Sequence, residues 1–182
     1  MRMITTRHHV IGLLVGLFML GLSAGVAAAG GATHAGARII DPAGQPIGWA
    51  QLTEDAAGQL HLNVQVIGLT PGRHGIHLHA VGQCVGPTFA SAGGHHNPLG
   101  AEHGLDNPAG AHAGDLPNLV VNVAGRGHLD AVGHHATLSS GPLSLLDTDG
   151  SAIVIHAFED DQVTNPTGNS GARVACGVIE AT

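Results

Sequence analysis

The segment Gly75-Ile76-His77-Leu78-His79, with the long connection that follows it to Asp115, is the stretch that decides the fold of this chain. Side chains two residues apart on a β-strand project from the same face, so His77 and His79 can reach one ion while Leu78 turns inward. The connection is rich in Gly, Pro, Asn and Ala and has neither helical nor strand periodicity. A connection of this length inside a compact domain needs something beyond secondary structure to order it.

The connection also carries residues of the types that bind metals, namely His95, His103, His112 and Asp115. Three imidazoles and one carboxylate make a complete tetrahedral set for Zn²⁺, and a closed set of four protein ligands is typical of structural zinc sites. Metal binding would then supply the folding free energy that the connection lacks. Histidine-rich tracts also bind metals loosely, so the prediction depends on the whole combination rather than on any single histidine.

Several segments of the chain resemble the copper,zinc superoxide dismutases in residue type, order and spacing. The matching residues are GIHLH (75–79), SAGGHHNP (91–98), His103, HAGD (112–115), His156 and GNSGARVACGVI (168–179). The resemblance extends over about residues 37 to 180, which is nearly all of the chain after its apolar beginning.

The resemblance implies two metal sites that share one histidine. Copper would be held by His77, His79, His95 and His156, and zinc by His95, His103, His112 and Asp115. His95 would lie between the two ions as an imidazolate. Asp160 matches the family's carboxylate that links a copper ligand to a zinc ligand, Thr167 the residue that narrows the substrate channel, and Arg173 the arginine that attracts superoxide. In this reading Arg173 and His95 are the catalytic residues.

The activity implied is the conversion of superoxide to dioxygen and hydrogen peroxide by alternate reduction and oxidation of copper, with protection against extracytoplasmic oxidative damage. The alternative is a copper- or zinc-binding buffer or delivery protein on the same scaffold. Binding proteins of this kind are expected to lose the bridging histidine or the arginine, and this chain keeps both His95 and Arg173. The sequence therefore favours the enzyme.

Residues 1–29 are typical of a secretory signal peptide. Arg2 and Arg7 precede an apolar run that ends in Ala27-Ala28-Ala29, a small-x-small cleavage pattern. We expect cleavage after Ala29, a disordered tail over 30–36, one domain over 37–182, and a periplasmic or secreted location. An uncleaved membrane anchor is the alternative, because the run is long enough to span a bilayer.

Charge and cysteine content narrow the choice of partners and compartment. The formal net charge is −7 and there is no lysine, which disfavours nucleic acid and anionic membrane surfaces as partners. After signal cleavage we expect no stable membrane partner, and a homodimer is left open. The two cysteines, Cys84 and Cys176, are predicted to form a disulfide rather than two free thiols, because the chain is expected to be exported. The early position of Cys84 resembles the bacterial exported branch of the family.

The remaining sequence predicts an all-β domain. Residues 47–53 and 60–66 alternate between apolar and polar and are joined by a turn at 54–58, which is typical of a hairpin. Further short strands are expected at 118–123, 127–132 and 152–157. We predict a Greek-key β-sandwich or a flattened eight-stranded β-barrel with long metal-binding and active-site loops, an architecture for which the family is a known example.

The other histidines receive weaker assignments. His74 is expected to hydrogen-bond to the backbone, and His96 to be an exposed neighbour of the metal site rather than a further ligand. His34 is expected in the tail. No specific role is assigned to His34, His96, His128, His134 or His135, and the last three are expected on the surface.

Overall fold

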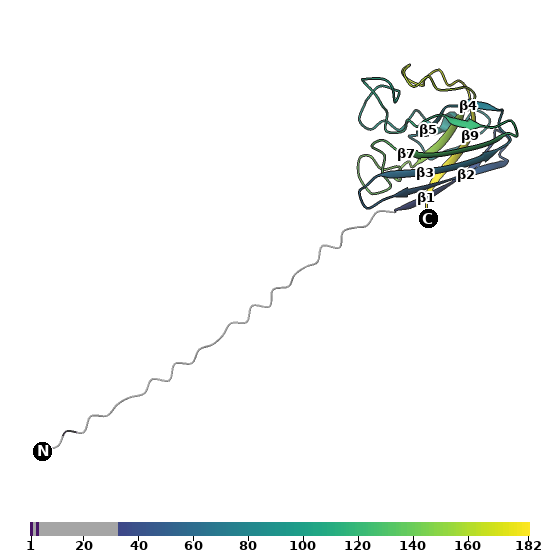
Figure 1. Ribbon diagram of the computed structural model, residues 1–182. Helices are drawn as coiled ribbons and strands as arrows, with labels where there is room; N and C mark the ends of the chain where they lie inside the picture. The colour runs from purple at the N-terminus through teal and green to yellow at the C-terminus, as the bar shows by residue number, and fades with distance from the viewer. Residues whose placement is uncertain (2, 4–32) are drawn as a thin grey trace.

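The computed structural model describes residues 1, 3 and 33–182, and residues 33–182 form an all-β domain (Figure 1). The predicted signal peptide over 1–29 falls almost entirely outside the described residues. Nine antiparallel strands make one sheet, and the single turn η1 (Ala90–Ala92) is the only helical segment in the described part of the chain. None of the described residues forms a helix with the length and hydrophobicity needed to cross a bilayer. The all-β prediction is confirmed.

The sheet closes on itself almost completely. In chain order the strands are β1 (His34–Ile40), β2 (Pro46–Glu54), β3 (Leu60–Ile67), β4 (Gly72–His74), β5 (Ile76–His79), β6 (Leu119–Val121), β7 (Arg126–Val132), β8 (Ser151–His156) and β9 (Arg173–Ala181). The spatial order β4-β6-β7-β3-β2-β1-β9-β8-β5 puts β4 and β5 at opposite edges, although only Gly75 separates them in the chain. The chain thus joins both edges, and counting β4 and β5 as one bent strand gives the eight strands predicted.

Gly75 is required at this junction because the backbone passes close to its neighbours. A Cβ atom at this position would lie 2.7 Å from Ser170 Cβ and 3.2 Å from Asp160 Cβ. Its N–H donates to Phe158 O and its carbonyl accepts from His156 N, both at 2.8 Å. Gly75 therefore brings the end of β8, with His156, next to the beginning of β5.

The predicted hairpin is present as β2 and β3, which pair from Gly48↔Val66 to Glu54↔Leu60. The apolar residues of β3 face the barrel interior and are at most 3% exposed: Leu60, Leu62, Val64 and Val66. The strands expected at 118–123, 127–132 and 152–157 correspond to β6, β7 and β8. The terminal strands β1 and β9 were not predicted, because their small and mixed residues give only a weak alternating pattern.

One boundary prediction is wrong. We expected residues 30–36 to be a disordered tail, but β1 begins at His34 and pairs with β2 and β9. Ala35 is 1% exposed, between Leu52 on one side and Ala181 on the other. A small side chain fits where two neighbouring strands approach, so residues 34–36 belong to the barrel despite their low hydrophobicity.

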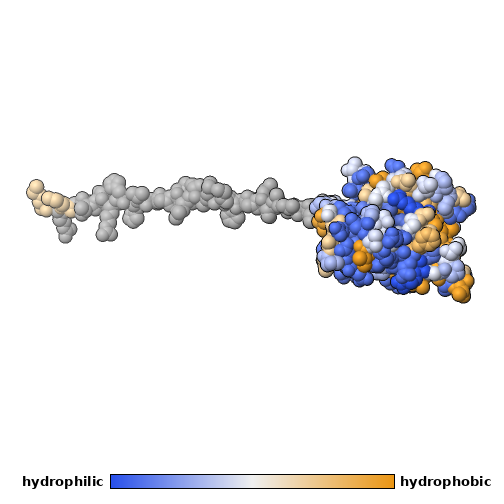
Figure 2. Space-filling view, turned by 90° about the horizontal axis from the view of Figure 1, so that it is seen from above, coloured by the Kyte–Doolittle hydropathy of each residue, from blue (hydrophilic) through white to orange (hydrophobic). Residues whose placement is uncertain are grey.

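The core is aliphatic, as the aromatic content of 2% requires. Leu, Ile, Val and Ala fill the barrel interior, and a smaller cluster around Phe89 and Cys176 packs outside it against β8. On the face in view, hydrophilic and hydrophobic side chains are mixed (Figure 2). The barrel interior thus provides a rigid base for the loops that follow β5.

Candidate metal centre

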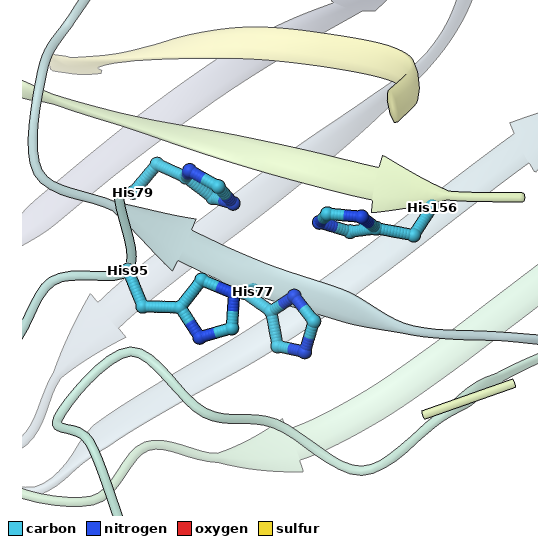
Figure 3. A group of neighbouring side chains, drawn as sticks. All are labelled: His77, His79, His95 and His156. Carbon is cyan, nitrogen blue, oxygen red and sulfur yellow. The ribbon is translucent and has the colours of Figure 1, made fainter. Parts of the chain in front are cut away.

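Four histidines converge at the end of β5, and we call them the strand set: His77, His79, His95 and His156 (Figure 3). His77 and His79 project from the same face of β5, while Leu78 between them is fully buried in the core. His156 ends β8, the strand that pairs with β5. One ligand atom from each histidine lies within 4.8 Å of those of the others.

Each member of the strand set has one buried ring nitrogen without a hydrogen-bond partner, namely His77 Nδ1, His79 Nε2, His95 Nε2 and His156 Nε2. The opposite nitrogens of the three strand residues are occupied. His77 Nε2 donates to Asp160 Oδ2 at 2.7 Å, His79 Nδ1 to Gly93 O at 2.9 Å, and His156 Nδ1 to Gly171 O at 3.1 Å. These bonds fix the tautomers, so the lone pairs of the unpartnered ring nitrogens face one another. Burying unpartnered polar atoms in this way costs free energy unless a metal ion binds them.

The strand set is also poised in the neutral, metal-binding protonation state. Burial lowers the pKa of His77 to about 3, that of His79 to about 2 and that of His156 to about 4. Burial likewise lowers the pKa of His95. Because a neutral imidazole can bind a metal through its free nitrogen, no proton has to be removed from His77, His79 or His156 near neutral pH.

A second group, which we call the loop set, lies on the other side of His95 and consists of His95, His103, His112 and Asp115. Asp115 Oδ1 lies 3.0 Å from His95 Nδ1, 2.9 Å from His103 Nδ1 and 3.4 Å from His112 Nδ1. The Nδ1 atoms of His95 and His112 are 3.2 Å apart. A tetrahedral zinc ion with bonds of about 2.0–2.1 Å separates its ligands by about 3.3 Å, so the loop set has the spacing of a zinc shell.

His77 also lies within reach of His95, His103 and Asp115. Its Nε2 is already bonded to Asp160, however, and its free Nδ1 belongs to the strand set. His112 therefore completes the loop set. Asp115 is fixed within it, because its Oδ2 accepts the backbone N–H groups of Gly104 and His112, both at 2.9 Å.

Asp160 connects the two sets. Its Oδ2 accepts from His77 Nε2 and its Oδ1 from His103 Nε2 at 3.0 Å, with all three side chains fully buried. Burial alone lowers the pKa of His103, but the hydrogen bonds to Asp115 and Asp160 outweigh it and raise this pKa to about 9. The same bonds hold the pKa values of Asp115 and Asp160 well below their usual range despite burial. A metal entering the loop set must therefore displace a proton from His103.

Two residues that support Asp160 were missed in the sequence. Asn118, which is buried, donates from Nδ2 to Asp160 O and accepts from Asp160 N at Oδ1, both at 2.8 Å. Gly168 has φ +59°, and a Cβ there would collide with the Asp160 carboxylate. No local pattern identifies Asn118, because its partner is 42 residues away. Gly168 lies within a segment that carries the family resemblance.

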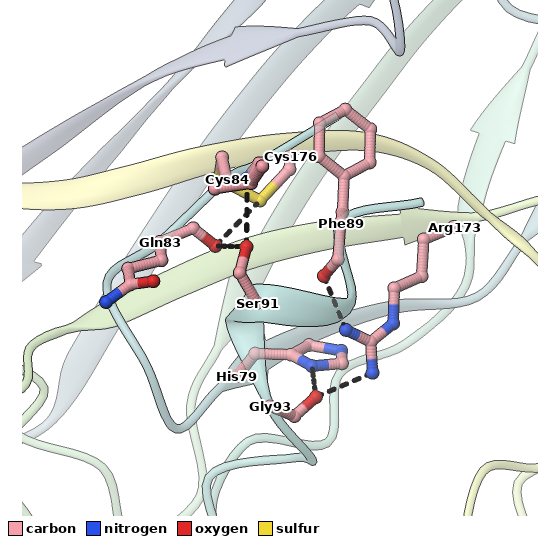
Figure 4. The surroundings of a disulfide bond; sticks show 9 residues. His79, Gln83, Cys84, Phe89, Ser91, Gly93, Arg173 and Cys176 are labelled. Atoms are coloured by element: carbon pink, nitrogen blue, oxygen red, sulfur yellow. Dashed lines mark hydrogen bonds between the residues drawn. A yellow bond between two sulfur atoms is a disulfide. The ribbon is translucent and has the colours of Figure 1, made fainter. Parts of the chain in front are cut away.

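Arg173, at the start of β9, is held beside the strand set rather than in a surface ion pair (Figure 4). Its two terminal nitrogens donate to Phe89 O and Gly93 O, both at 2.6 Å. Gly93 O also accepts from His79 Nδ1. Arg173 also lines an open hollow together with Pro87, Thr88, Ala90, Gly171 and Ala172. Thr167 is exposed in the turn before Arg173, and its carbonyl accepts from Ser170 Oγ at 2.9 Å.

The predicted disulfide between Cys84 and Cys176 is confirmed, with a Cα–Cα distance of 5.6 Å. It ties the loop that carries Phe89 and Gly93 to β9, which carries Arg173 (Figure 4). Ser91 Oγ reinforces this loop by donating to Gln83 O and accepting from Val85 N. The carbonyls that hold Arg173 are thus fixed by a covalent link close by.

Two of the remaining histidines are placed by hydrogen bonds. His74 lies with Nδ1 2.7 Å from His156 O and Nε2 2.9 Å from Thr70 O, which confirms its predicted bonding to the backbone. The expectation that His96 is exposed is wrong, because it is only 5% exposed and its Nε2 lies 3.3 Å from Leu143 O. His128, His134 and His135 are exposed, as expected.

Comparison with known proteins agrees with this geometry. Residues 47–179 match the sequence model of the family described as copper/zinc superoxide dismutase. Among curated proteins, the chain is 44% identical over 140 residues to a Cu-Zn superoxide dismutase of Caulobacter vibrioides, covering 75% of this chain and 80% of the relative. It is 42% identical over 144 residues to the superoxide dismutase-like protein YojM of Bacillus subtilis, covering 78% of this chain and 74% of the relative.

Solved structures show the same architecture. A double mutant of a superoxide dismutase-like protein from Bacillus subtilis, in which a tyrosine and a proline are replaced by histidine, matches with a TM-score of 0.76 and 42% identity, covering 82% of this chain and 97% of the other. The Cu/Zn superoxide dismutase from Brucella abortus matches with a TM-score of 0.65 and 30% identity, covering 81% and 99%. The chain belongs to the copper/zinc superoxide dismutase family.

Proposed function

We propose that this chain is an exported superoxide dismutase that converts superoxide to dioxygen and hydrogen peroxide. The observation that carries the proposal is the position of His95, which offers Nδ1 to the loop set and Nε2 to the strand set. Arg173 lies beside the same strand set and shares the Gly93 carbonyl with His79. A shared imidazole next to an anchored cation suits one-electron chemistry on a small anion.

The two sets differ in donor chemistry, and each fits a different metal. Four neutral imidazole nitrogens in the strand set suit copper, while three imidazoles and a carboxylate at tetrahedral spacing in the loop set suit zinc. Copper, when bound, would supply the one-electron oxidation and reduction of superoxide. Zinc has no redox chemistry of its own and would order the connection between β5 and β6.

The chain's own residues then supply substrate attraction and a proton. Arg173 donates one N–H to each of two carbonyl oxygens. Its other N–H groups remain available to an anion in the hollow. His95 can hold a proton at Nε2 and pass it to the reduced product, because Nδ1 and Asp115 keep the ring in place. Asp160 holds His77 and His103 in their ring orientations, and Thr167 narrows the approach.

Export is supported by the disulfide, since such bonds persist in oxidising compartments. We therefore assign residues 1–29 as a cleaved signal peptide and place the enzyme in the periplasm or outside the cell. An uncleaved anchor would place the same domain on the outer side of a membrane. N-terminal sequencing of the purified protein distinguishes the two, because cleavage leaves Gly30 as the first residue.

A metal buffer or delivery protein is the second candidate, because a relative 42% identical is itself described only as superoxide dismutase-like. The two functions share metal binding and differ in turnover. Retention of both Arg173 and the four-nitrogen strand set favours turnover.

The test measures superoxide dismutation together with copper and zinc content in the wild type, in His156→Ala and in His134→Ala. We expect the wild type to hold one of each metal and to be active. His156→Ala should lose more than about a hundredfold in activity, because even outer hydrogen-bond partners of metal ligands contribute about 10- to 100-fold. His134→Ala, which changes an exposed histidine, should match the wild type. Full metal loading without turnover in the wild type would instead support the buffer.

A further inference from the structure

We propose that the outer face of the barrel carries a third metal site, formed by Asn63, His128 and Asp130, which binds a divalent transition-metal ion and Cu²⁺ in preference to the others. These residues lie on β3 and β7, and none belongs to the strand set or the loop set. The site requires no change in the backbone and depends only on side chains already in contact.

The register of the sheet brings the three residues to one face. Asn63 on β3 pairs directly with Asp130 on β7, and Gln65 pairs with His128. His128 and Asp130 are two residues apart on β7, so both project outward, whereas Leu129 between them is buried. The result is a diagonal triangle of polar side chains across two adjacent strands.

The polar atoms of the three side chains lie within hydrogen-bond distance of one another. His128 Nε2 lies 3.3 Å from Asp130 Oδ2, and the Asn63 amide nitrogen lies 3.0 Å from His128 Nε2 and 2.5 Å from Asp130 Oδ1. A half-turn of the Asn63 amide places its Oδ1 where Nδ2 now lies. The three residues then present an imidazole nitrogen, a carboxylate oxygen and an amide oxygen at the edges of one coordination shell, with the remaining positions open to water.

A neighbouring pair shows what distinguishes this triangle from an ordinary surface contact. His61 Nε2 lies 3.0 Å from Asp55 Oδ2, but Asp55 uses its Oδ1 to accept the N–H groups of Ala57 and Gln59 in the hairpin turn. Asp55 is therefore a turn residue with one histidine attached. Asp130 accepts no backbone N–H among the described residues, and its carboxylate is directed at the two other members of the triangle.

The chemistry and exposure of the site determine which ion it takes. Mixed nitrogen and oxygen donors bind Cu²⁺ more tightly than other divalent first-row ions. The side chains of His128 and Asp130 are 56% and 69% exposed, so the ion can exchange with solvent while both interior sets are filled. The negative charge of the chain further favours cations at its surface.

The experiment titrates Cu²⁺ by calorimetry into the protein whose copper and zinc sites are already filled, and compares single variants. We expect one additional equivalent of Cu²⁺ to bind, with an affinity higher than that of Cu²⁺ for any other surface histidine. His128→Ala should abolish this equivalent. Asp130→Asn, which keeps the histidine and the shape, should weaken it at least tenfold. His61→Ala is the matched control and should leave it unchanged.

Superoxide dismutation should be equal in all of these variants, which shows that the interior sites and the fold are intact. The proposal is overturned if no additional equivalent binds, if Asp130→Asn binds as tightly as the wild type, or if His61→Ala causes the same loss as His128→Ala. Equal affinity in Asp130→Asn would mean that a lone histidine binds the ion.

Discussion

The strand set and the loop set share His95 but are built in different ways. Three of the four strand-set histidines come from β5 and β8, whose pairing fixes their positions before any metal binds. All four members of the loop set come from the connection between β5 and β6, whose only helical or strand element is the short turn η1. Its ligands are held by Asp115 and by Asp160, which Asn118 and Gly168 keep in place. One half of the centre is thus organised by the sheet and the other half by buried carboxylates.

The strand set and the loop set also differ in the protonation state of their histidines. Burial keeps the strand-set histidines neutral, because it lowers their pKa values far below neutral pH. In the loop set, Asp115 and Asp160 raise the pKa of His103 to about 9, so under the proposed assignment zinc would displace a proton from this ring. Zinc binding should therefore release a proton and weaken as the pH falls, whereas copper binding should depend on pH much less.

The largest loss of stability should come from removing the disulfide between Cys84 and Cys176, which lies beside the strand set. In the chain-entropy model, closing a loop between residues 92 apart stabilises the folded state by about 4–5 kcal/mol. The double variant Cys84→Ser and Cys176→Ser should lose about this free energy of unfolding, measured by urea denaturation of the metal-loaded protein. A loss below about 1 kcal/mol would show that the loop is already held by Ser91 and the packing of Phe89.

An intermediate effect is expected from Asp160→Asn, which removes the charge that joins the two sets. Loss of an outer hydrogen-bond partner weakens metal binding by about 10- to 100-fold. We expect zinc affinity, measured by competition with a chelator, to fall within this range and copper affinity to fall less, because β5 still positions His77.

Glu159→Gln is the control for this variant, since Glu159 is an exposed neighbour that pairs with Arg73. It should leave both affinities unchanged. An equal loss of copper and zinc affinity in Asp160→Asn would contradict the view that the sheet contributes more than Asp160 to the positions of the strand-set histidines.

The same division explains what could be predicted from the sequence. Alternation identified the hairpin of β2 and β3, and the two-residue spacing of His77 and His79 identified their common face, because strand periodicity is local. The ligands of the connection came from residue type and from the resemblance. Three features depend on contacts distant in sequence, which no local pattern contains: the support from Asn118, the contact of His96 with the Leu143 carbonyl, and the strand at His34.

The smallest effect concerns Glu54, a buried carboxylate that ties a loop to a strand without any metal. Its two oxygens accept the Leu138 N–H, the Ser139 N–H and the Ser139 hydroxyl, which fixes the loop at 138–139 to the end of β2. Burial alone raises the pKa of Glu54, but the hydrogen bonds from Ser139 and Leu138 outweigh it and hold the pKa below the ordinary value of 4.5. Because the folded-state pKa is depressed, the stabilisation is complete above about pH 4.5 and is lost as the pH falls through the lower, folded-state value.

Glu54→Gln tests this anchor in isolation from the metal centre. The variant should be less stable than the wild type by about 1–2 kcal/mol at pH 7, since it replaces charge-assisted hydrogen bonds with neutral ones. The difference should shrink as the pH is lowered below 4.5, because this carboxylate takes up a proton in the unfolded chain before it does so in the folded wild type. Urea denaturation of both proteins at a series of pH values measures this difference. A stability difference between the two proteins that stays constant through the acid range would mean that the shape of the side chain, and not its charge, holds the loop. Buried carboxylates would then not be the common means by which this barrel fixes its loops.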